Sequence, residues 1–146
     1  MFENLKRVCK NAKKLDSDKL LKKVFNDPAV KEYVATLQQN QMYDDGVDSK
    51  GVSLGDYSDA SVKIYGKPDG HIRMYDTGAF FKSIKIKSQS QDIVISANTI
   101  KTAWDGAIDL LDRWVNLLGL NEKSLSRLRE YVLPLFIAEV RASLFA

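Results

Sequence analysis

Residues 43–84 decide the fold of this chain, and they read YDDGVDSKGVSLGDYSDASVKIYGKPDGHIRMYDTGAFFKSI. Aspartates and glycines recur through the first half, and Asp76-Thr77-Gly78 then leads directly into the apolar pair Phe80-Phe81. Glycine tolerates a positive φ, and aspartate hydrogen-bonds its own neighbouring backbone, so both residues favour tight turns. The stretch therefore predicts two turn-rich loops, followed by a short helix that feeds a strand.

Two helical regions are predicted before this stretch. The first is a basic arm, residues 1–25, whose apolar residues share one helix face with lysines on the other: Leu5, Val8, Cys9, Ala12 and Leu15. A break is expected at residues 16–18. Asp27 and Pro28 then have the pattern of an N-cap and a first helical residue. The helix that they begin is expected to run to Asp45-Gly46.

Local signals divide the next part of the chain. Ser58 is a candidate cap for a short helix that ends at Gly66, and a strand over residues 61–65 is the competing interpretation. Either Asp76 or Thr77 is expected to cap the helical turn at Phe80. Alternation over residues 83–87 and the apolar run 93–95 predict a β-hairpin with its turn at residues 88–90.

Helix is predicted to resume near Ala103. Its apolar stripe would be Trp104, Ile108, Leu111, Val115 and Leu118. Gly119 would close that helix, and Asn121 would cap a last helix that runs to the end of the sequence.

These elements predict an α+β fold, with several helices packed around a small, mainly antiparallel sheet and a long helical C-terminal region. A chain of 146 residues is expected to form one domain. Within the domain 1–146 we distinguish the arm at 1–25, a core of helix, loops and hairpin at 28–98, and C-terminal helices at 103–146.

Composition excludes several protein classes. The chain is 45% hydrophobic and 28% charged, and it has no apolar run of the ~20 residues that a membrane span needs. No membrane partner is therefore expected. The first residues lack the apolar core of a secretory signal, and the single Cys9 cannot form an internal disulfide. We expect synthesis in a bacterial cytoplasm.

Positive charge is concentrated at the start of the sequence. Residues 1–23 contain eight basic and three acidic residues, a net charge of +5, which leaves −2 for the rest because the whole chain carries +3. Such an arm can contact DNA or an acidic partner, or it can simply be a solvated helix face. The candidate contacts are Lys6, Arg7, Lys10, Lys13 and Lys14.

No catalytic, metal-binding or cofactor-binding residue is predicted. Five aspartates in the loops suggest calcium ligands, but they lack the order of a calcium loop: Asp44, Asp45, Asp48, Asp56 and Asp59. His71 is the only histidine and is most simply an exposed polar residue in a turn. The triplet Asp76-Thr77-Gly78 also occurs in aspartic proteases, where it follows an apolar strand that is not expected here. We expect a protein that is not an enzyme.

Aromatic and basic residues alternate between Tyr57 and Lys82. Rings beside cations can stack on single-stranded nucleic acid. The alternative is that Phe80 and Phe81 pack in the hydrophobic core.

The last helix carries more apolar residues than one buried face requires. Leu133 and Ile137 lie off the stripe of Val132, Leu135 and Phe136, and Pro134 interrupts the helix. Either two layers of the same fold cover this helix, or a neighbouring subunit does, and we favour the subunit. The predicted interface residues are Leu133, Phe136, Ile137, Val140, Leu144 and Phe145.

The order of these elements resembles the small head–tail connector and tail-completion (neck, ring) proteins of tailed bacteriophages. In those families a helix precedes Asp/Gly-rich turns that lead to a Tyr or Trp. A lysine-bearing segment follows, and then a Leu-x-x-Thr-Gly-x-Leu-x-x-Ser block that heads a strand pair. This chain is similar at residues 41–57, 61–67 and 74–84, with Phe80 where leucine is usual.

The match covers about residues 38–97, and the helical end from Trp104 is less typical of the families. The form DSKGVSLGDY at residues 48–57 is most similar to versions in phages of Bacteroidetes, including the crAss-like group.

The resemblance implies a non-catalytic structural protein of the virion. It would be one subunit of a ring at the head–tail junction, between the portal and the tail, with the genome in its channel. Its partners would be copies of itself, the portal or other connector and tail proteins, and genomic DNA in non-specific contact. The motif residues would serve folding: Gly46, Gly51, Tyr57, Asp76, Thr77 and Gly78. The alternative is a small nucleic-acid-binding module that uses the basic arm.

Overall fold

The computed structural model describes residues 1–89 and 92–146. In chain order its elements are α1 (Phe2–Lys13), α2 (Ser17–Asn26), α3 (Pro28–Tyr43), α4 (Asp59–Tyr65), α5 (Ala79–Ser83), β1 (Lys85–Gln89), β2 (Asp92–Ser96), β3 (Ile100–Ala103), β4 (Gly106–Asp109), α6 (Leu110–Arg113) and α7 (Glu122–Leu144).

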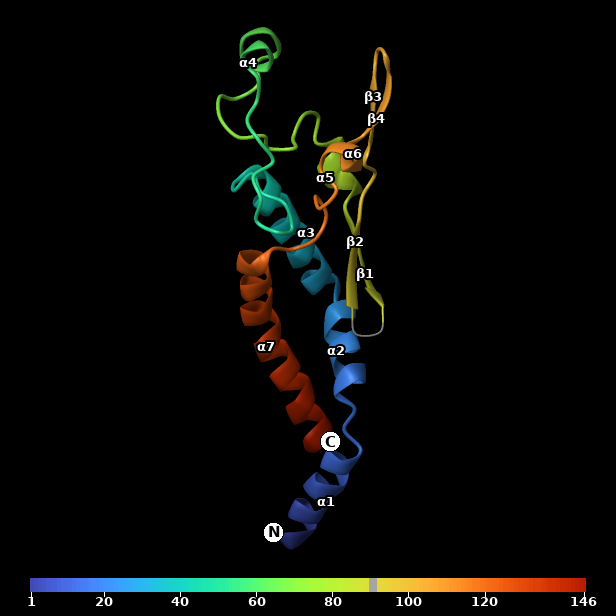
Figure 1. Ribbon diagram of the computed structural model, residues 1–146. Helices are drawn as coiled ribbons and strands as arrows, with labels where there is room; N and C mark the ends of the chain where they lie inside the picture. The colour runs from blue at the N-terminus through green and yellow to red at the C-terminus, as the bar shows by residue number, and fades with distance from the viewer. Residues whose placement is uncertain (90–91) are drawn as a thin grey trace.

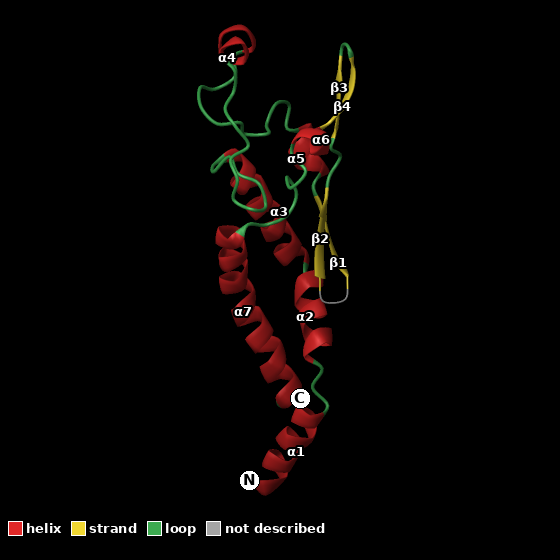
Figure 2. Cartoon of the chain, in the orientation of Figure 1, coloured by secondary structure: helices red, strands yellow, loops and turns green. Residues whose placement is uncertain are grey.

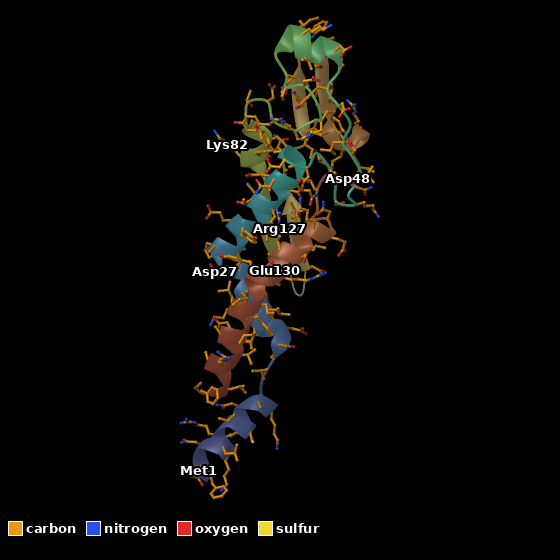
Figure 3. The ribbon with its side chains drawn as sticks, turned by 90° about the vertical axis from the view of Figure 1, so that its left-hand side faces the viewer. Met1, Asp27, Asp48, Lys82, Arg127 and Glu130 are labelled. Atoms are coloured by element: carbon orange, nitrogen blue, oxygen red, sulfur yellow. The ribbon has the colours of Figure 1, made fainter. Side chains whose placement is uncertain are left out.

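The molecule is elongated (Figure 1). α1 and the end of α7 lie at one end, and α4 and the β3–β4 hairpin project from the other. Helices dominate the lower half, and the loops gather in the upper half (Figure 2). A view turned by 90° shows the same long outline, with Met1 at its lower tip (Figure 3). We call the two extremities the α1 end and the hairpin end.

Five of the described helices begin with a side-chain N-cap, and at α6 this cap is Asp109, which accepts from Leu111 N–H at 3.0 Å. Asp16, Asp27, Ser58 and Asn121 each accept a hydrogen bond from a backbone N–H in the first turn of the helix that follows. Pro28 occupies the first turn of α3, where a missing N–H is tolerated. The predicted caps Asp27, Ser58 and Asn121 are thereby confirmed.

α4 is a helix, so the competing strand over residues 61–65 is wrong. It ends at Gly66, which has a φ of 64° in the left-handed conformation and donates its N–H to Ser61 O.

The predicted hairpin is confirmed as β1–β2, an antiparallel pair with Ile86 opposite Ile95. The predicted turn at residues 88–90 is wrong for Ser88 and Gln89, which belong to β1. Ser90 lies outside the described residues. The α+β class is also confirmed, although the strands form two separate two-stranded sheets.

The helix predicted from Ala103 to Gly119 is wrong on both sides of α6 (Leu110–Arg113), because residues 114–121 contain no helix and Gly119 therefore closes none. Residues 100–109 form a second antiparallel hairpin, β3–β4, and the short helix α6 follows. The spacing of Trp104, Ile108 and Leu111 fits a helix, but Asp105-Gly106 is a turn sequence. Gly106 adopts a φ of 134°, which no helix contains. The turn chemistry therefore outweighs the apolar period.

Two clusters of buried residues form the core. The lower cluster joins α2, α3 and α7 through Val24, Val30, Val34, Leu37, Leu128 and Val132. The upper cluster joins the end of α3 to the loops through Met42, Leu54, Ile72, Ile84 and Leu117. Ile86 and Ile95 of the first hairpin pack against both clusters, which makes the core continuous.

None of the helices in the described part of the chain combines the length and the apolarity that crossing a bilayer requires.

Candidate functional site

Hydrogen bonds join the two turn-rich loops to each other. Tyr57 N–H donates to Gly70 O at 3.0 Å, and Ile72 N–H donates to Gly55 O at 2.8 Å. The Tyr57 hydroxyl accepts from Arg73 N–H at 3.2 Å. Tyr57 therefore links the loops through both its backbone and its side chain.

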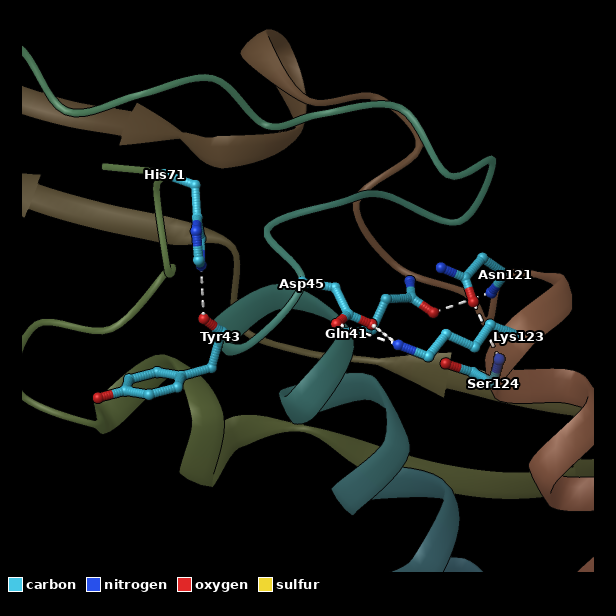
Figure 4. A network of polar contacts seen from close by, with 7 residues as sticks. All are labelled: Gln41, Tyr43, Asp45, His71, Asn121, Lys123 and Ser124. Atoms are coloured by element: carbon cyan, nitrogen blue, oxygen red, sulfur yellow. Dashed lines mark hydrogen bonds and ion pairs between the residues drawn. The ribbon is translucent and has the colours of Figure 1, made fainter. Parts of the chain in front are cut away.

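His71 closes the loop pair against the end of α3 (Figure 4). Its Nε2 lies 2.9 Å from Tyr43 O. Its ring also covers Gly46 so closely that a Cβ at Gly46 would lie 2.5 Å from His71 Cδ2. His71 is thus a half-buried, bonded residue rather than the exposed turn residue that the sequence predicts.

The loop aspartates hold turns and one ion pair. Asp48 accepts from Lys50 N–H at 2.8 Å and from Val52 N–H at 3.0 Å, and Gly51 N–H donates to Asp48 O at 3.0 Å. Asp45 pairs with Lys123 at 3.2 Å. Within residues 1–89 and 92–146, no three His, Cys, Asp or Glu side chains lie together as metal ligands would.

The three residues of the triplet 76–78 make different contacts. Asp76 forms ion pairs with Lys67 at 3.0 Å and with Lys101 at 3.4 Å. The hydrogen bond from Lys67 and the positive charge of Lys101 hold the pKa of the Asp76 carboxyl below its ordinary value. The predicted cap at Asp76 or Thr77 is wrong, because Gly78 occupies the N-cap position of α5, although the Thr77 hydroxyl accepts from Ala79 N–H at 3.2 Å. Asp76 therefore stays ionised, unlike the proton-sharing carboxyl of an aspartic protease.

Gly78 is the residue immediately before α5. Its φ is 85°, and an added Cβ would lie 3.0 Å from the Tyr75 hydroxyl. Both the backbone conformation and the close ring favour glycine at this position.

A cavity of about 600 Å³ lies among the second loop, α5, β3 and α6. Its cationic lining residues are Lys67, Lys101 and Arg113. Both lysines pair with Asp76, and the Arg113 guanidinium lies 4.4 Å from the ring centroid of Trp114. The charges of this cavity are therefore largely satisfied within the chain.

The aromatic residues do not form one open stacking surface. Phe80 and Phe81 pack against the upper cluster, and Tyr75 meets Phe81 edge-on with ring centroids 5.4 Å apart. Tyr65 lies apart from them on α4, where it is 75% exposed. The core interpretation of Phe80 and Phe81 is thereby confirmed.

The predicted basic contacts all lie on α1 or at its end. The exposed residues are Lys6, Arg7, Lys10, Lys13 and Lys14. Lys6 forms an ion pair with Glu3 at 3.3 Å. Asn11 joins the helix to the end of α7, because its Nδ2 donates to Leu144 O at 2.9 Å.

The predicted interface residues of α7 differ in burial. Leu133 is 56% exposed, and Ile137 and Phe145 are also exposed. Val140 and Leu144 are half-buried, and Phe136 packs against the lower cluster. The structure therefore leaves Leu133 and Ile137 open on the side away from the core.

Two buried glutamines, missed by the sequence analysis, organise the centre. Gln38 Nε2 donates to Leu117 O at 3.1 Å, and its Oε1 accepts from Gly119 N–H at 2.8 Å. Gln41 Nε2 donates to Gly119 O, and its Oε1 accepts from Asn121 N–H, both at 2.8 Å. We call this arrangement the glutamine clamp; Figure 4 shows its Gln41–Asn121 part.

The clamp fixes where α7 begins. Asn121, which Gln41 holds, in turn accepts from Ser124 N–H at 3.0 Å as the cap of α7. The only sequence signal for the clamp is the polar run QQNQ at residues 38–41, which also fits a solvated helix face.

Comparisons of the chain with protein-family models, with curated proteins and with solved structures find no match. The resemblance to phage connectors therefore rests on the sequence pattern and stays a prediction.

Proposed function

We propose that this protein is a structural assembly protein, a ring subunit that joins the capsid portal to the tail of a tailed bacteriophage and surrounds the DNA channel. The sequence pattern of residues 38–97 supports the family, and the distribution of exposed apolar residues supports assembly. In this proposal the protein has a structural role and turns over no substrate.

One observation carries the assembly role: the described side chains of three peripheral elements include none that is buried, yet they include large, exposed apolar ones. No residue of α1 or α4, both fully described, is buried. Phe2 on α1 is 75% exposed, and Ile64 on α4 is 72% exposed. On the β3–β4 hairpin Trp104 is 98% exposed.

Such elements are weak when they stand alone. Isolated helices shorter than ~12–15 residues are marginal in water, and α1 has 12 residues and α4 only seven. A lone two-stranded hairpin is also marginal. Contact with a neighbouring molecule would cover their apolar residues and stabilise all three, which is what a subunit of an assembly requires.

Sedimentation velocity and negative-stain electron microscopy of the purified protein test the proposal. We expect closed rings of one size, together with the protein's presence in purified phage particles by mass spectrometry. A monomer at every concentration and its absence from such particles would contradict the proposal.

A second candidate, nucleic-acid binding by the arm, is favoured by the exposed basic face of α1 at one tip of the molecule. Replacing Lys10, Lys13 and Lys14 with glutamine should then weaken DNA binding and reduce its salt dependence by about three phosphate contacts. Binding that is weak and unchanged by these substitutions would leave the arm to a protein partner.

A further inference from the structure

We propose that the β3–β4 hairpin of one copy docks into the groove between α2 and α7 of another copy. This inference rests on the proposed function, because it requires that the chain assembles with itself, and it identifies the two surfaces that meet.

The inserting element is the hairpin tip. Trp104 and Asp105 form the turn between Ala103 and Gly106, which are paired in the ladder. All described side chains from residue 100 to residue 108 are exposed, including Ile100 and Ile108. Burying an indole removes roughly 150–250 Å² of surface from water, so Trp104 is a strong anchor for an interface.

The receiving surface is an open groove of about 960 Å³. Its apolar lining residues come from α2, α7 and the segment before α2: Leu15, Leu20, Val24, Leu135 and Ala138. Lys23 on α2 and Glu139 on α7 bridge it with an ion pair of 2.9 Å. The groove is large enough for an aromatic side chain and its neighbours.

Charge favours this pairing. Lys14, Lys19 and Lys22 also line the groove, and in the described part of the chain they form no ion pair. The groove also contains Asp16 and Asp27, whose side chains accept the N-cap hydrogen bonds of α2 and α3. An inserted tip would place Asp105 among these lysines and Trp104 against their alkyl stems.

The two surfaces cannot meet within one copy. The hairpin projects from one end of the elongated molecule, and α2 and the second half of α7 lie toward the other (Figure 1). A contact between two different patches is heterologous, and repetition of such a contact generates a closed ring or an open filament. The occupant of the groove is therefore a second copy, not the chain's own hairpin.

A pair of complementary variants tests the contact. Trp104→Ala removes the inserting side chain and leaves the groove intact, whereas Ala138→Trp fills the groove and leaves the hairpin intact. Both positions are exposed, so circular dichroism should show folded proteins for both variants. We expect each variant alone to be monomeric in sedimentation velocity. Their mixture should form a 1:1 dimer that grows no further, because only one hairpin and one groove remain competent.

A second test reverses the charges on the two sides of the proposed contact. Asp105→Lys should raise the dissociation constant of self-association about tenfold or more. Adding Lys19→Glu and Lys22→Glu to that variant should restore association. Val115→Ser, at a 78% exposed position outside both the groove and the hairpin, is the matched control for a surface change that spares both partners.

Failure of this inference can be distinguished from failure of the proposed function. Wild-type protein that stays monomeric, variants that assemble as the wild type does, or a mixture that stays monomeric would each overturn the inference. If the variants behave as expected but the protein is absent from purified phage particles, the inference holds and the virion role fails. If the protein is present in particles and Trp104→Ala still forms the wild-type ring, the virion role holds and the inference fails.

Discussion

The centre of the molecule and its two ends satisfy their polar and apolar groups in different ways. At the centre, buried Gln38 and Gln41 bond the backbone of residues 117–121, and buried apolar clusters lie on both sides. At the ends, α1, α4 and the β3–β4 hairpin have no buried residue in the described part of the chain. The centre satisfies these groups within one copy, whereas the ends leave large apolar side chains exposed.

This difference separates residues that serve folding from residues that serve contact. Substitutions at the centre should change the free energy of unfolding, whereas substitutions at the ends should change association.

Gln41→Ala should be the most damaging change. It leaves Gly119 O and Asn121 N–H without their partner, and each unpaired buried group costs about 1–3 kcal/mol. We expect a loss of about 2–4 kcal/mol in the free energy of unfolding, measured with urea. Asn40→Ala, one residue away on the exposed side of α3, is the matched control and should change stability by less than about 0.5 kcal/mol. Equal losses in the free energy of unfolding at the two positions would contradict the role of the buried glutamine.

Gly46→Ala should lower stability by about 2–3 kcal/mol, because it combines a positive φ with a clash against the His71 ring. Gly66→Ala has nearly the same φ but open space around its Cβ, so only the backbone penalty of about 1 kcal/mol applies. The double change Gly46→Ala with His71→Ala should remove the clash component. Thermal unfolding of the four proteins resolves these contributions, and a Gly66→Ala effect as large as that of Gly46→Ala would refute the role of His71.

Asp76→Asn should have a smaller and pH-dependent effect. The carboxyl is about half exposed, so its ion pairs with Lys67 and Lys101 are screened and contribute less than about 1 kcal/mol. Its folded pKa lies below the unfolded value of about 3.9. The contribution is therefore present at neutral pH and is lost as the pH falls below about 4 through the folded pKa. The difference between wild type and variant should shrink from pH 7 to pH 3; a constant difference would show that Asp76 acts through packing.

The double change Leu133→Ser with Ile137→Ser should barely affect the monomer, by about 0.5 kcal/mol or less, because both side chains are exposed. It should weaken assembly if this side of α7 meets a neighbour. Val132→Ser is the control on the buried side of the same helix, and it should destabilise the monomer by about 2 kcal/mol. A steep loss of stability in the double variant without change in oligomeric state would place Leu133 and Ile137 in the interior.

The sequence predicts the features whose chemistry is local. A helix cap involves residues two or three positions apart, so Asp27, Ser58 and Asn121 are recognisable without knowledge of the fold. Gly66 after α4 and the alternating pattern of β1 belong to the same class.

The sequence does not predict contacts between distant residues. Gln41 and Gly119 are 78 positions apart, and nothing in a polar run distinguishes a buried clamp from a solvated face. The sequence does not predict the β3–β4 hairpin for another reason: Trp104, Ile108 and Leu111 fit a helical period, which the Trp104-Asp105 turn before Gly106 overrides. The sequence predicts an exposed His71 because the partner of its ring, Tyr43 O, is 28 positions away in the chain.

Hydrogen exchange, measured by mass spectrometry on the dilute monomer and on the assembled protein, tests the separation of centre and ends most directly. We expect the amides of α3 and of residues 117–121 to exchange slowly in both samples. Those of α1, α4 and the β3–β4 hairpin should exchange quickly in the monomer and slowly in the assembly. Peripheral amides that are already as slow as the central ones in the monomer, or that stay fast after assembly, would contradict this account.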